Sequence, residues 1–467
     1  MNATQLTLCL IARDEECFLP RCLESVRGVV DRIVLVDTGS TDRTAEIARE
    51  HGAVVVEHAW NDDFSAARNA ALEHVSEGYV LVLDADEMLA PGAGAVLRQA
   101  VERGNFDYAQ LPLYNASTVD APAEDVVAGP ALKSGPVQLA RLFRYLPDLR
   151  WEGIVHENVQ SWALKHTRSV DLHDVAIVHY GAVDSVREEK GKQARNLRLL
   201  EKRCFDAGNS DPLALCYLCF ERQNAGDVRG ARDAAQLAWE ALVARREAGD
   251  TTHDIVFPMT QWVTRLLSEG NLAESGAVLG RALDWGIDHP NLWFLSGRLE
   301  ECRWLADGGH DQQDARLQRA RELYERCLSG THLAQEPYAI DGVNSWRART
   351  RMGTVDLLAG RVEAALEAFD ATLAERPNEV AARLGRVEAL WNLGRAEQAF
   401  GEIEPLLHPN LPDGWALGAL CGMVLEGFAA IAPVFERCCQ IAKEHPFLEP
   451  HRRHYLAAIG DHATSAA

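Results

Sequence analysis

The 467-residue sequence contains no apolar run approaching the ~20 residues that a membrane-spanning helix needs. Its first ten residues also lack the basic segment and long apolar segment of an export signal. Positive charge is scarce: 47 Lys and Arg residues stand against 69 Asp and Glu residues, which gives a net charge of −22. Nucleic acid and anionic membranes are therefore excluded as partners, because phosphate contacts need an excess of Lys and Arg. We expect a cytoplasmic protein without a transmembrane segment.

Paired cysteine motifs are also nearly absent. The eleven cysteines, without an export signal, are expected to be reduced thiols in packed helices. Cys216 and Cys219 form a C-x-x-C pair, but no second pair accompanies it and it lies in a helical pattern. Core packing is therefore favoured over zinc binding there. The length predicts two or three domains, and the 47% hydrophobic and 25% charged residues are typical of globular proteins.

The N-terminal half alternates short apolar segments with amphipathic ones. Strands are predicted at residues 6–12, 33–36, 54–57 and 80–83, with helical spacing in the segments between them. This alternation with short connections predicts an α/β fold, with a mostly parallel, Rossmann-like sheet covered by helices on both faces. Later strands are predicted at residues 107–113, 137–145 and 170–180. Between them, residues 115–136 are rich in Gly, Pro and Asp and are predicted to form a loop, a candidate acceptor loop or lid.

Three carboxylates follow directly where the fourth predicted strand ends. The sequence there is Asp84-Ala85-Asp86-Glu87. Parallel sheets bind ligands just beyond the carboxyl ends of their strands, and carboxylates are the ligands that Mg²⁺ or Mn²⁺ prefers when it bridges a diphosphate. An acidic turn or a helix N-cap is the alternative. Neither G-x-G-x-x-G after the first strand nor a P-loop is present, so a metal would have to neutralise the phosphates of a bound nucleotide. This combination favours sugar nucleotides.

Four motifs occur in order along this half: LIARDEE at 10–16, IVLVDTGSTDRT at 33–44, DDFSAARN at 62–69 and LVLDADE at 81–87. The series resembles family-two glycosyltransferases with the GT-A fold. It is similar to the bacterial subgroup that includes the sublancin-type peptide S-glycosyltransferases. The resemblance covers roughly residues 5–200 and implies a UDP-sugar-dependent hexosyltransferase.

The resemblance also implies a role for each matched residue. The nucleoside pocket would be lined by residues 12–15, largely through their backbone, and Asp37 would accept hydrogen bonds from the base or ribose. Arg68 would lie near the base or diphosphate, Asp84 would reach the ribose and Asp86 would hold the metal. Arg68 pairing with Asp62 or Asp63 on the surface, and Asp37 capping its own turn, are the alternatives. The residues expected to bind the nucleotide sugar are Ala12, Arg13, Asp14, Glu15, Asp37, Arg68, Asp84, Ala85, Asp86 and Trp151.

Residues 151–158, WEGIVHEN, contain the candidate general base. An aromatic ring at Trp151 allows a sugar face to stack, and the motif resembles the W-x-G…E segment of the same family. That resemblance implies Glu157 as the base that an inverting transfer needs, with Glu152 as the second choice. It also implies that His179, at the end of an apolar strand, joins Asp86 in binding Mn²⁺ or Mg²⁺. A purely structural Trp151 and a polar strand end at His179 are the alternatives.

The sequence changes character after residue 207, where strand patterns give way to amphipathic helices. Gly360-Arg361 and Gly394-Arg395 open similar segments 34 residues apart, and Gly226 and Gly270 look like the same turn in earlier units. The pattern resembles tetratricopeptide repeats, which stack into a superhelix with a concave surface. We expect a GT-A domain at residues 1–207 and a tetratricopeptide-like domain at residues 208–467. The repeats would recruit a peptide or protein, or serve a homodimer.

These patterns together predict a metal-dependent, inverting glycosyltransferase. It would move a sugar from a UDP-sugar to an acceptor hydroxyl or thiol, on a peptide or protein that the repeats recruit. A transferase of lipopolysaccharide or other glycans, with the repeats used for assembly, is the first alternative. A catalytically inactive repeat scaffold and a nucleotidyltransferase are the others; the absence of a basic Gly-rich loop near the first strand counts against nucleotidyl transfer. No motif identifies the sugar.

Overall fold

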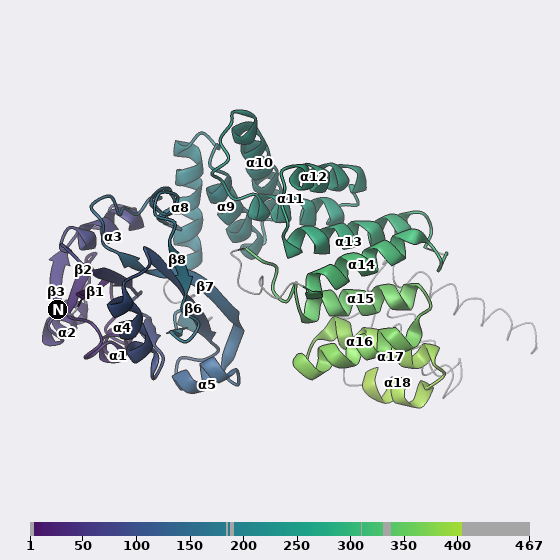
Figure 1. The fold of residues 1–467 in the computed structure, drawn as a ribbon, viewed down its shortest axis with the longest axis horizontal. Coiled ribbons are helices and arrows are strands. Elements are labelled where there is room, and N and C mark those ends of the chain that lie inside the picture. Colours follow the sequence, from purple (N-terminus) through teal and green to yellow (C-terminus); the bar gives the residue numbers. More distant parts are fainter. Residues whose placement is uncertain (1–3, 184, 187–190, 310, 330–337, 404–467) are drawn as a thin grey trace, which may run out of the picture. The chain divides into compact units, whose positions relative to one another are not determined.

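The computed structural model describes residues 4–183, 185–186, 191–309, 311–329 and 338–403 (Figure 1). The chain divides into two compact units, Met1–Trp262 with Gln335–Tyr338, and Val263–Ala334 with Ala339–Ala467. The domain boundary predicted at residue 207 falls inside the first unit, between α8 (Lys192–Asp206) and α9 (Pro212–Asn224). In the described part of the chain, no helix is long and apolar enough to cross a membrane.

A mixed sheet, nine-stranded among the described residues, forms the centre of the first unit. Its order is β3-β2-β1-β4-β7-β6-β9-β5, and β8 pairs with β6. Strands β1 to β4 pair in parallel, and β7 runs antiparallel to both β4 and β6. The predicted α/β fold is therefore confirmed. The strands are β1 (Leu6–Ala12), β2 (Arg32–Asp37), β3 (Val54–Glu57), β4 (Tyr79–Val82), β5 (Glu87–Leu89), β6 (Tyr108–Ala116), β7 (Leu132–Arg144), β8 (Ser169–Asp171) and β9 (Ile177–His179).

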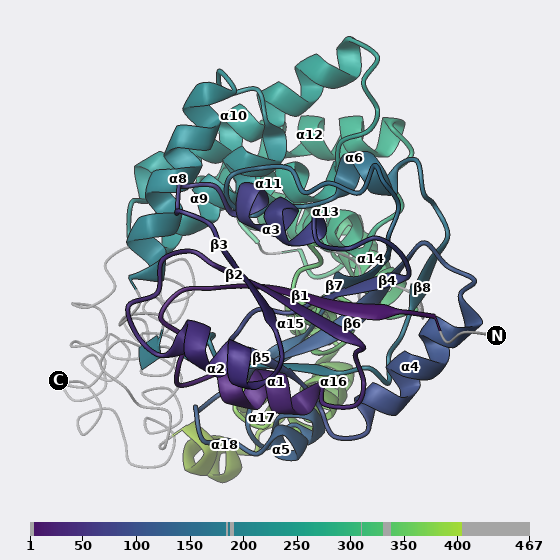
Figure 2. The ribbon, with the colours of Figure 1, turned by 90° about the vertical axis from the view of Figure 1, so that its left-hand side faces the viewer.

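Helices cover both faces of this sheet, because successive residues of the buried strands point to opposite sides. On β1, Leu8 and Leu10 pack with one set of helices, and Cys9 packs with the other. Each fully buried Leu contributes about 1.5–3 kcal/mol. The first set is α1 (Leu19–Ser25), α2 (Thr44–Glu50) and α4 (Ala93–Arg103); the second is α3 (Phe64–Leu72) and α6 (Gln160–Ala163). Figure 2 shows α3 on one side of β1 and α1 and α2 on the other. Because β1 pairs in parallel with both β2 and β4, the carboxyl ends of these three strands meet at one edge of the sheet.

The prediction of a loop at residues 115–136 is wrong in part. These residues contain α5 (Ala123–Ala128), and β7 begins at Leu132, earlier than predicted. Val126 packs with Ala116 and Tyr180, and the Tyr180 hydroxyl donates a hydrogen bond to the Ala121 carbonyl (3.0 Å). The small apolar residues of α5 are ordered by this long-range packing, which the local Gly and Pro content does not reveal.

Helices follow one another through the rest of the described chain. Gly226, Gly270, Gly360 and Gly394 all adopt left-handed backbone angles, with φ between 71° and 78°, and each separates the two helices of a pair. The four predicted turns are therefore confirmed. The remaining helices are α10 (Val228–Glu247), α11 (Val256–Ser268), α12 (Leu272–Asp284), α13 (Pro290–Ala306), α14 (Ala315–Ser329), α15 (Trp346–Leu358), α16 (Val362–Glu375), α17 (Val380–Asn392) and α18 (Ala396–Ile403).

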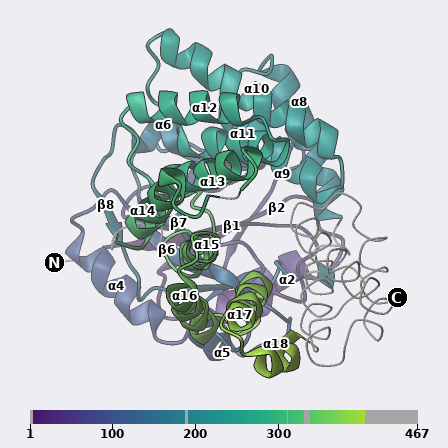
Figure 3. The same ribbon diagram turned by 90° about the vertical axis from the view of Figure 1, so that its right-hand side faces the viewer.

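The helix pairs of the second unit stack in sequence order, as Figure 3 shows for α13 to α18. Phe369 of α16 packs against two glycines on the neighbouring helices, Gly353 and Gly385. A Cβ atom at either position would lie within 3.0 Å of its ring. The helices predicted between residue 404 and about residue 456 lie outside the described residues.

Candidate functional site

A cavity of about 930 Å³ opens at the carboxyl ends of β1 and β4, within the first unit. The end of β1, the turn after β4, strand β7, the 151–160 segment and the first turn of α8 all line it. Helices α9 and α11 line it too, although they belong to the part of the chain predicted as the repeat domain. The cavity therefore combines elements from both sides of the predicted boundary.

Arg68 lies between two carboxylates in this cavity. Its Nη2 is 2.8 Å from Asp84 Oδ1, and its Nε is 2.5 Å from Glu157 Oε1. The Arg68 residue is only 8% exposed. Burial opposes its charge, but Asp84 and Glu157 together raise the pKa of the guanidinium, so Arg68 stays protonated. This arginine joins the acidic end of β4 to the candidate base, two sites 73 residues apart in the chain.

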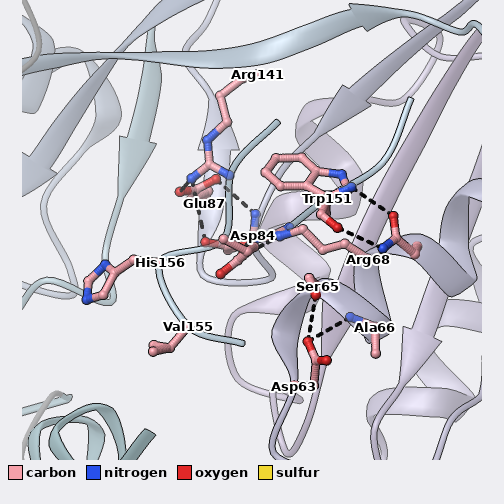
Figure 4. Close-up of polar contacts among 12 residues, drawn as sticks. Asp63, Ser65, Ala66, Arg68, Asp84, Glu87, Arg141, Trp151, Val155 and His156 are labelled. Carbon is pink, nitrogen blue, oxygen red and sulfur yellow. Dashed lines mark hydrogen bonds and ion pairs between the residues drawn. The ribbon is translucent and has the colours of Figure 1, made fainter. Parts of the chain in front are cut away.

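The alternative pairing of Arg68 at the surface is wrong. Asp62 pairs instead with Arg198 of α8, at 2.6 Å. Asp63 caps α3, because its Oδ1 accepts a hydrogen bond from the backbone N–H of Ala66 (3.0 Å) (Figure 4). A capping carboxylate at the start of α3 fixes the helix so that Arg68, on the buried side, faces the sheet edge.

A second arginine, Arg141 of β7, meets the same acidic turn from the other side (Figure 4). Its Nη2 is 2.5 Å from Glu87 Oε1 and 3.6 Å from Asp84 Oδ2. Glu87 Oε2 accepts a hydrogen bond from the Asp84 backbone N–H (2.9 Å), which holds the turn closed. Burial acts to raise the pKa of both carboxyl groups. At Glu87 burial prevails, and the pKa is raised. At Asp84 the two arginines outweigh it and hold the pKa well below its usual range, so Asp84 stays ionised.

Asp86 lies beside His179, as a shared metal site would require. Asp86 is 6% exposed, and its Oδ1 is 3.6 Å from His179 Nε2. His179 Nδ1 is 2.9 Å from the amide oxygen of Asn115, which can only accept, so Nδ1 donates this hydrogen bond. Lys192 Nζ of α8 donates to Asp86 Oδ2 (2.9 Å). Burial raises the pKa of Asp86, but His179 and Lys192 outweigh it and lower the pKa.

These residues fit a divalent metal whose remaining ligands come from a diphosphate or water. In the described part of the chain, no group of three His, Cys, Asp or Glu side chains could hold a metal by itself. Mg²⁺ and Mn²⁺ sites of this kind use one or two protein carboxylates together with substrate phosphates. The cysteine pair also gives no such site: Cys216 and Cys219 are buried on α9.

Two carboxylates were candidates for the general base, and only Glu157 lines the cavity. Glu152 is exposed and accepts a hydrogen bond from the Ser161 hydroxyl (2.6 Å). The backbone of Trp151 exchanges two hydrogen bonds with the side chain of Asn69 (2.9 and 3.0 Å), and the Trp151 ring lies 5.1 Å from the Arg68 guanidinium carbon. The motif is thereby fixed against α3, next to the arginine that Glu157 pairs with.

Two of the expected nucleotide-sugar residues do not line the cavity. Asp14 Oδ1 accepts a hydrogen bond from the Thr41 backbone (2.7 Å), and Asp37 Oδ1 accepts one from the Ser40 backbone (3.0 Å). Asp14 and Asp37 therefore brace the turn after β2, and the turn-capping alternative describes Asp37 well. The expected residues that line the cavity are Ala12, Arg13, Glu15, Arg68, Asp84, Ala85, Asp86 and Trp151.

Sequence reasoning missed an aromatic wall of the cavity. His156 stacks on Tyr217 of α9, with ring centroids 3.8 Å apart and planes 2° apart. Tyr338 stacks in the same way on Phe257 of α11 (4.4 Å, 6°), and Tyr217 meets Phe257 edge to face. Burial lowers the pKa of His156 to about 4, so its ring is neutral at physiological pH. Nothing in the sequence links residue 217 to residue 338, so only the fold reveals this wall.

The sheet order, with the acidic turn after β4, defines an α/β domain of the GT-A type. Residues 7–168 match the model of glycosyl transferase family 2. Residues 356–418 match a tetratricopeptide repeat model. The N-terminal part of the chain is thus a family-two glycosyltransferase domain, and the C-terminal part carries tetratricopeptide repeats, as the sequence motifs predicted.

Two curated proteins are similar to part of this chain. A TPR repeat-containing protein of Synechococcus elongatus is 38% identical over 221 residues, which cover 46% of this chain and 50% of that protein. The SPbeta prophage-derived glycosyltransferase SunS of Bacillus subtilis is 24% identical over 201 residues, or 42% of this chain and 44% of SunS. The chain spans about half the length of these curated relatives. Among solved structures, residues 1–349 of TarS from S. aureus align over 64% of this chain and 83% of that one, with 14% identity and a TM-score of 0.31.

Proposed function

We propose that this protein is a metal-dependent, inverting glycosyltransferase that moves a sugar from a UDP-sugar to a hydroxyl or thiol of a polypeptide. The observation that carries the proposal is one cavity lined by Asp84 and Asp86, in the turn after β4. Asp86 lies 3.6 Å from His179, and Asp84 is joined through Arg68 to Glu157. The carboxylates proposed to act at the diphosphate and the proposed base thus line the same cavity, on a family-two glycosyltransferase domain.

The diphosphate end would be held by Asp86, His179 and the first turn of α8. Asp86 and His179 would hold a divalent ion, Mn²⁺ or Mg²⁺, which neutralises the leaving diphosphate when bound. Lys192 and Arg195 line the same end and add positive charge as the bond between the sugar and the diphosphate breaks. Asp84, which two arginines hold ionised, would accept hydrogen bonds from the ribose hydroxyls.

Glu157 would take the proton of the acceptor as its oxygen or sulfur attacks the anomeric carbon from the face opposite the diphosphate. A general base needs a free carboxylate oxygen within hydrogen-bond reach of the proton that it takes, and Glu157 Oε1 lies 2.5 Å from Arg68 Nε. We therefore expect the acceptor to compete with Arg68 for this carboxylate.

The aromatic wall would form the acceptor side of the cavity. Tyr217 and Tyr338 come from the helical part of the chain, and stacked rings give a contact surface that suits peptide side chains or sugar faces. Tetratricopeptide superhelices offer extended concave surfaces, which suits a polypeptide acceptor or a protein partner. The GT-A part at residues 1–207 would then catalyse the transfer, and the repeats from residue 208 would recruit the acceptor or a protein partner.

The proposal is tested by substituting Asp86. Asp86→Ala should abolish Mn²⁺-dependent UDP binding in calorimetry and UDP release from a panel of UDP-sugars, because it removes one of the two protein ligands. Asp62→Ala, which breaks a surface pair with Arg198, should leave both measurements unchanged. Wild-type turnover by Asp86→Ala in excess EDTA would show that the metal site is assigned wrongly. If the wild type releases UDP from no donor and binds none, the chain is an inactive scaffold.

A further inference from the structure

Gln138 of β7 is a buried amide in the wall of the cavity. The residue is 6% exposed, and among the described residues neither its Oε1 nor its Nε2 has a hydrogen-bond partner. Arg141 Nε, three residues further along the strand, is buried without a partner as well, even though the Nη2 of the same guanidinium contacts Glu87. Buried polar atoms are nearly always paired in folded proteins, so three unpaired atoms on one wall point to a missing partner.

A bulge in β7 sets the direction in which Gln138 faces. Ala109 of β6 pairs with Leu142, but the next residue, Gln110, pairs with Ala140, so Arg141 is the extra residue. The bulge places Ala140 in the same hydrophobic cluster as Phe143 and Trp151, instead of the cluster that contains Leu142. Because alternate strand residues share a face, Gln138 lies on the Ala140 side of the sheet. This is the side of Trp151 and the candidate base.

The unpaired atoms specify the chemistry of the missing partner. The Gln138 amide offers one acceptor and two donors, and Arg141 Nε offers one donor. A pair of neighbouring hydroxyls satisfies such a set, because each hydroxyl both donates and accepts. A phosphate cannot pair with the amide oxygen, since an ionised phosphate has no proton to donate. An apolar side chain would leave all three atoms unpaired.

The position of these atoms favours the transferred sugar as the source of the hydroxyls. Arg141 touches Asp84, at the diphosphate end of the cavity, and Gln138 shares a sheet face with Trp151 beside Glu157. Under the proposed function, the transferred sugar must lie between the diphosphate and the base. We infer that Gln138, with Arg141 Nε, recognises hydroxyl groups of the donor's transferred sugar and so determines which sugar is used. This inference rests on the proposed function.

The experiment compares UDP with UDP-sugars on the full-length chain. Calorimetry with UDP, UDP-glucose, UDP-galactose and UDP-N-acetylglucosamine in Mn²⁺ identifies the donor that the wild type prefers. Gln138→Leu should weaken that donor about tenfold or more, because two neutral hydrogen bonds are lost, and should leave UDP affinity unchanged. Its melting temperature without ligand should be equal or higher, since an unpaired buried amide is removed. Gln193→Leu, at an exposed position of α8 outside the cavity, is the matched control.

A second variant covers the case in which Gln138→Leu does not fold. Gln138→Glu keeps one acceptor oxygen and replaces the donor NH2 group with a second acceptor, so it should change the ranking of the sugars while UDP still binds. Unchanged donor affinity in both variants would overturn the inference, as would an equal loss for UDP and UDP-sugar. A loss confined to the KM of the acceptor would also overturn it and assign the hydroxyls to the acceptor. Should wild-type protein bind no UDP-sugar, the proposed function itself fails, which is a separate result.

Discussion

Arg68 is the residue on which the charges of the cavity depend. It is buried and contacts both Asp84 and Glu157, so its removal would leave two carboxylates without their partner. Breaking a buried ion pair by removing one member typically costs about 3–5 kcal/mol. An Arg68 substitution would therefore lower the free energy of unfolding as well as affect catalysis, and the two effects would be hard to separate. Uncharged replacements of the carboxylates, which keep their size, are better probes of function.

Among these uncharged replacements, Glu157→Gln tests the proposed general base most directly. We expect transfer to the acceptor to fall ~10²–10⁴-fold, the usual cost of losing a general base, while UDP affinity stays close to that of the wild type. Rates with a saturating donor and calorimetry with UDP measure the two effects. Glu152→Gln is the matched control, because Glu152 is exposed and bonded to Ser161, and it should transfer normally. A crippled Glu152→Gln beside a normal Glu157→Gln would assign the base to Glu152.

At the scale of elements, Asp86 connects the end of β9 to the start of α8, because it contacts both His179 and Lys192. Gly181, two residues after His179, packs so closely that a Cβ atom there would lie 1.9 Å from Asp86 Oδ2 and 2.8 Å from Lys192 Nζ. Because residue 181 has no side chain, the carboxylate of Asp86, after β4, can contact Lys192, at the start of α8.

Gly181→Ala should accordingly displace Asp86 or Lys192. We expect Mn²⁺-dependent UDP affinity to fall at least about tenfold, with the far-ultraviolet circular dichroism unchanged, because only side chains at the site have to move. Gly280→Ala on α12 is the control: no atom lies within 4 Å of its added Cβ, and alanine favours a helix. Normal UDP affinity in Gly181→Ala would mean that the contact between Asp86 and Lys192 does not matter for binding.

The sequence predicted elements with strong local patterns and missed those made by distant contacts. Strands β1 and β3 lie at the predicted residues, because each is a short apolar run between polar turns. Strand β5 was not predicted, and its first residue, Glu87, was read as part of the acidic segment, since the pairing of β5 with β9 joins segments about 90 residues apart. Among cavity residues, Asp84 and Asp86 follow a recognisable strand. Gln138 was not predicted, because no periodicity tells a buried amide that needs a ligand from an ordinary strand residue.

At the scale of the whole molecule, the first compact unit extends past the predicted boundary. Tyr217, Phe257 and Tyr338 line or support the cavity, and all three lie after residue 207. Arg203 of α8 also donates to the Val155 carbonyl (2.6 Å) and pairs with Asp211 at the start of α9 (2.7 Å). The segment that carries Glu157 is therefore anchored by α8, which is in turn held by the start of α9, a helix that the sequence had assigned to the repeats.

Two truncations separate catalysis from recruitment. A chain ending at Ala339 keeps Tyr338 and loses α15 to α18; we expect donor hydrolysis to remain, because repeat arrays lose terminal units almost independently. Transfer to a polypeptide acceptor should fall roughly 10²-fold, as expected when a second binding contact is lost. A chain ending at residue 207 lacks the aromatic wall and should lose both activities. Full hydrolysis by a folded 1–207 chain would place the boundary where the sequence predicted it.

The ion pairs around Asp84 have a consequence for the order of loading. The charged Arg, Lys, Asp and Glu side chains that line the cavity balance one another, with five basic and five acidic: Arg13, Arg68, Arg141, Lys192 and Arg195 with Glu15, Asp84, Asp86, Glu157 and Asp254. Such a site is close to electroneutral before anything enters it, so a bare divalent cation gains little by binding and must first displace Lys192 from Asp86. In a nucleotide diphosphate that already carries a divalent ion, the ion offsets most of the negative charge of the phosphates. Such a complex therefore changes the net charge of the cavity little. We therefore expect Mn²⁺ and UDP to enter as one species, and Mn²⁺ alone to give almost no heat in the calorimetry proposed for Asp86.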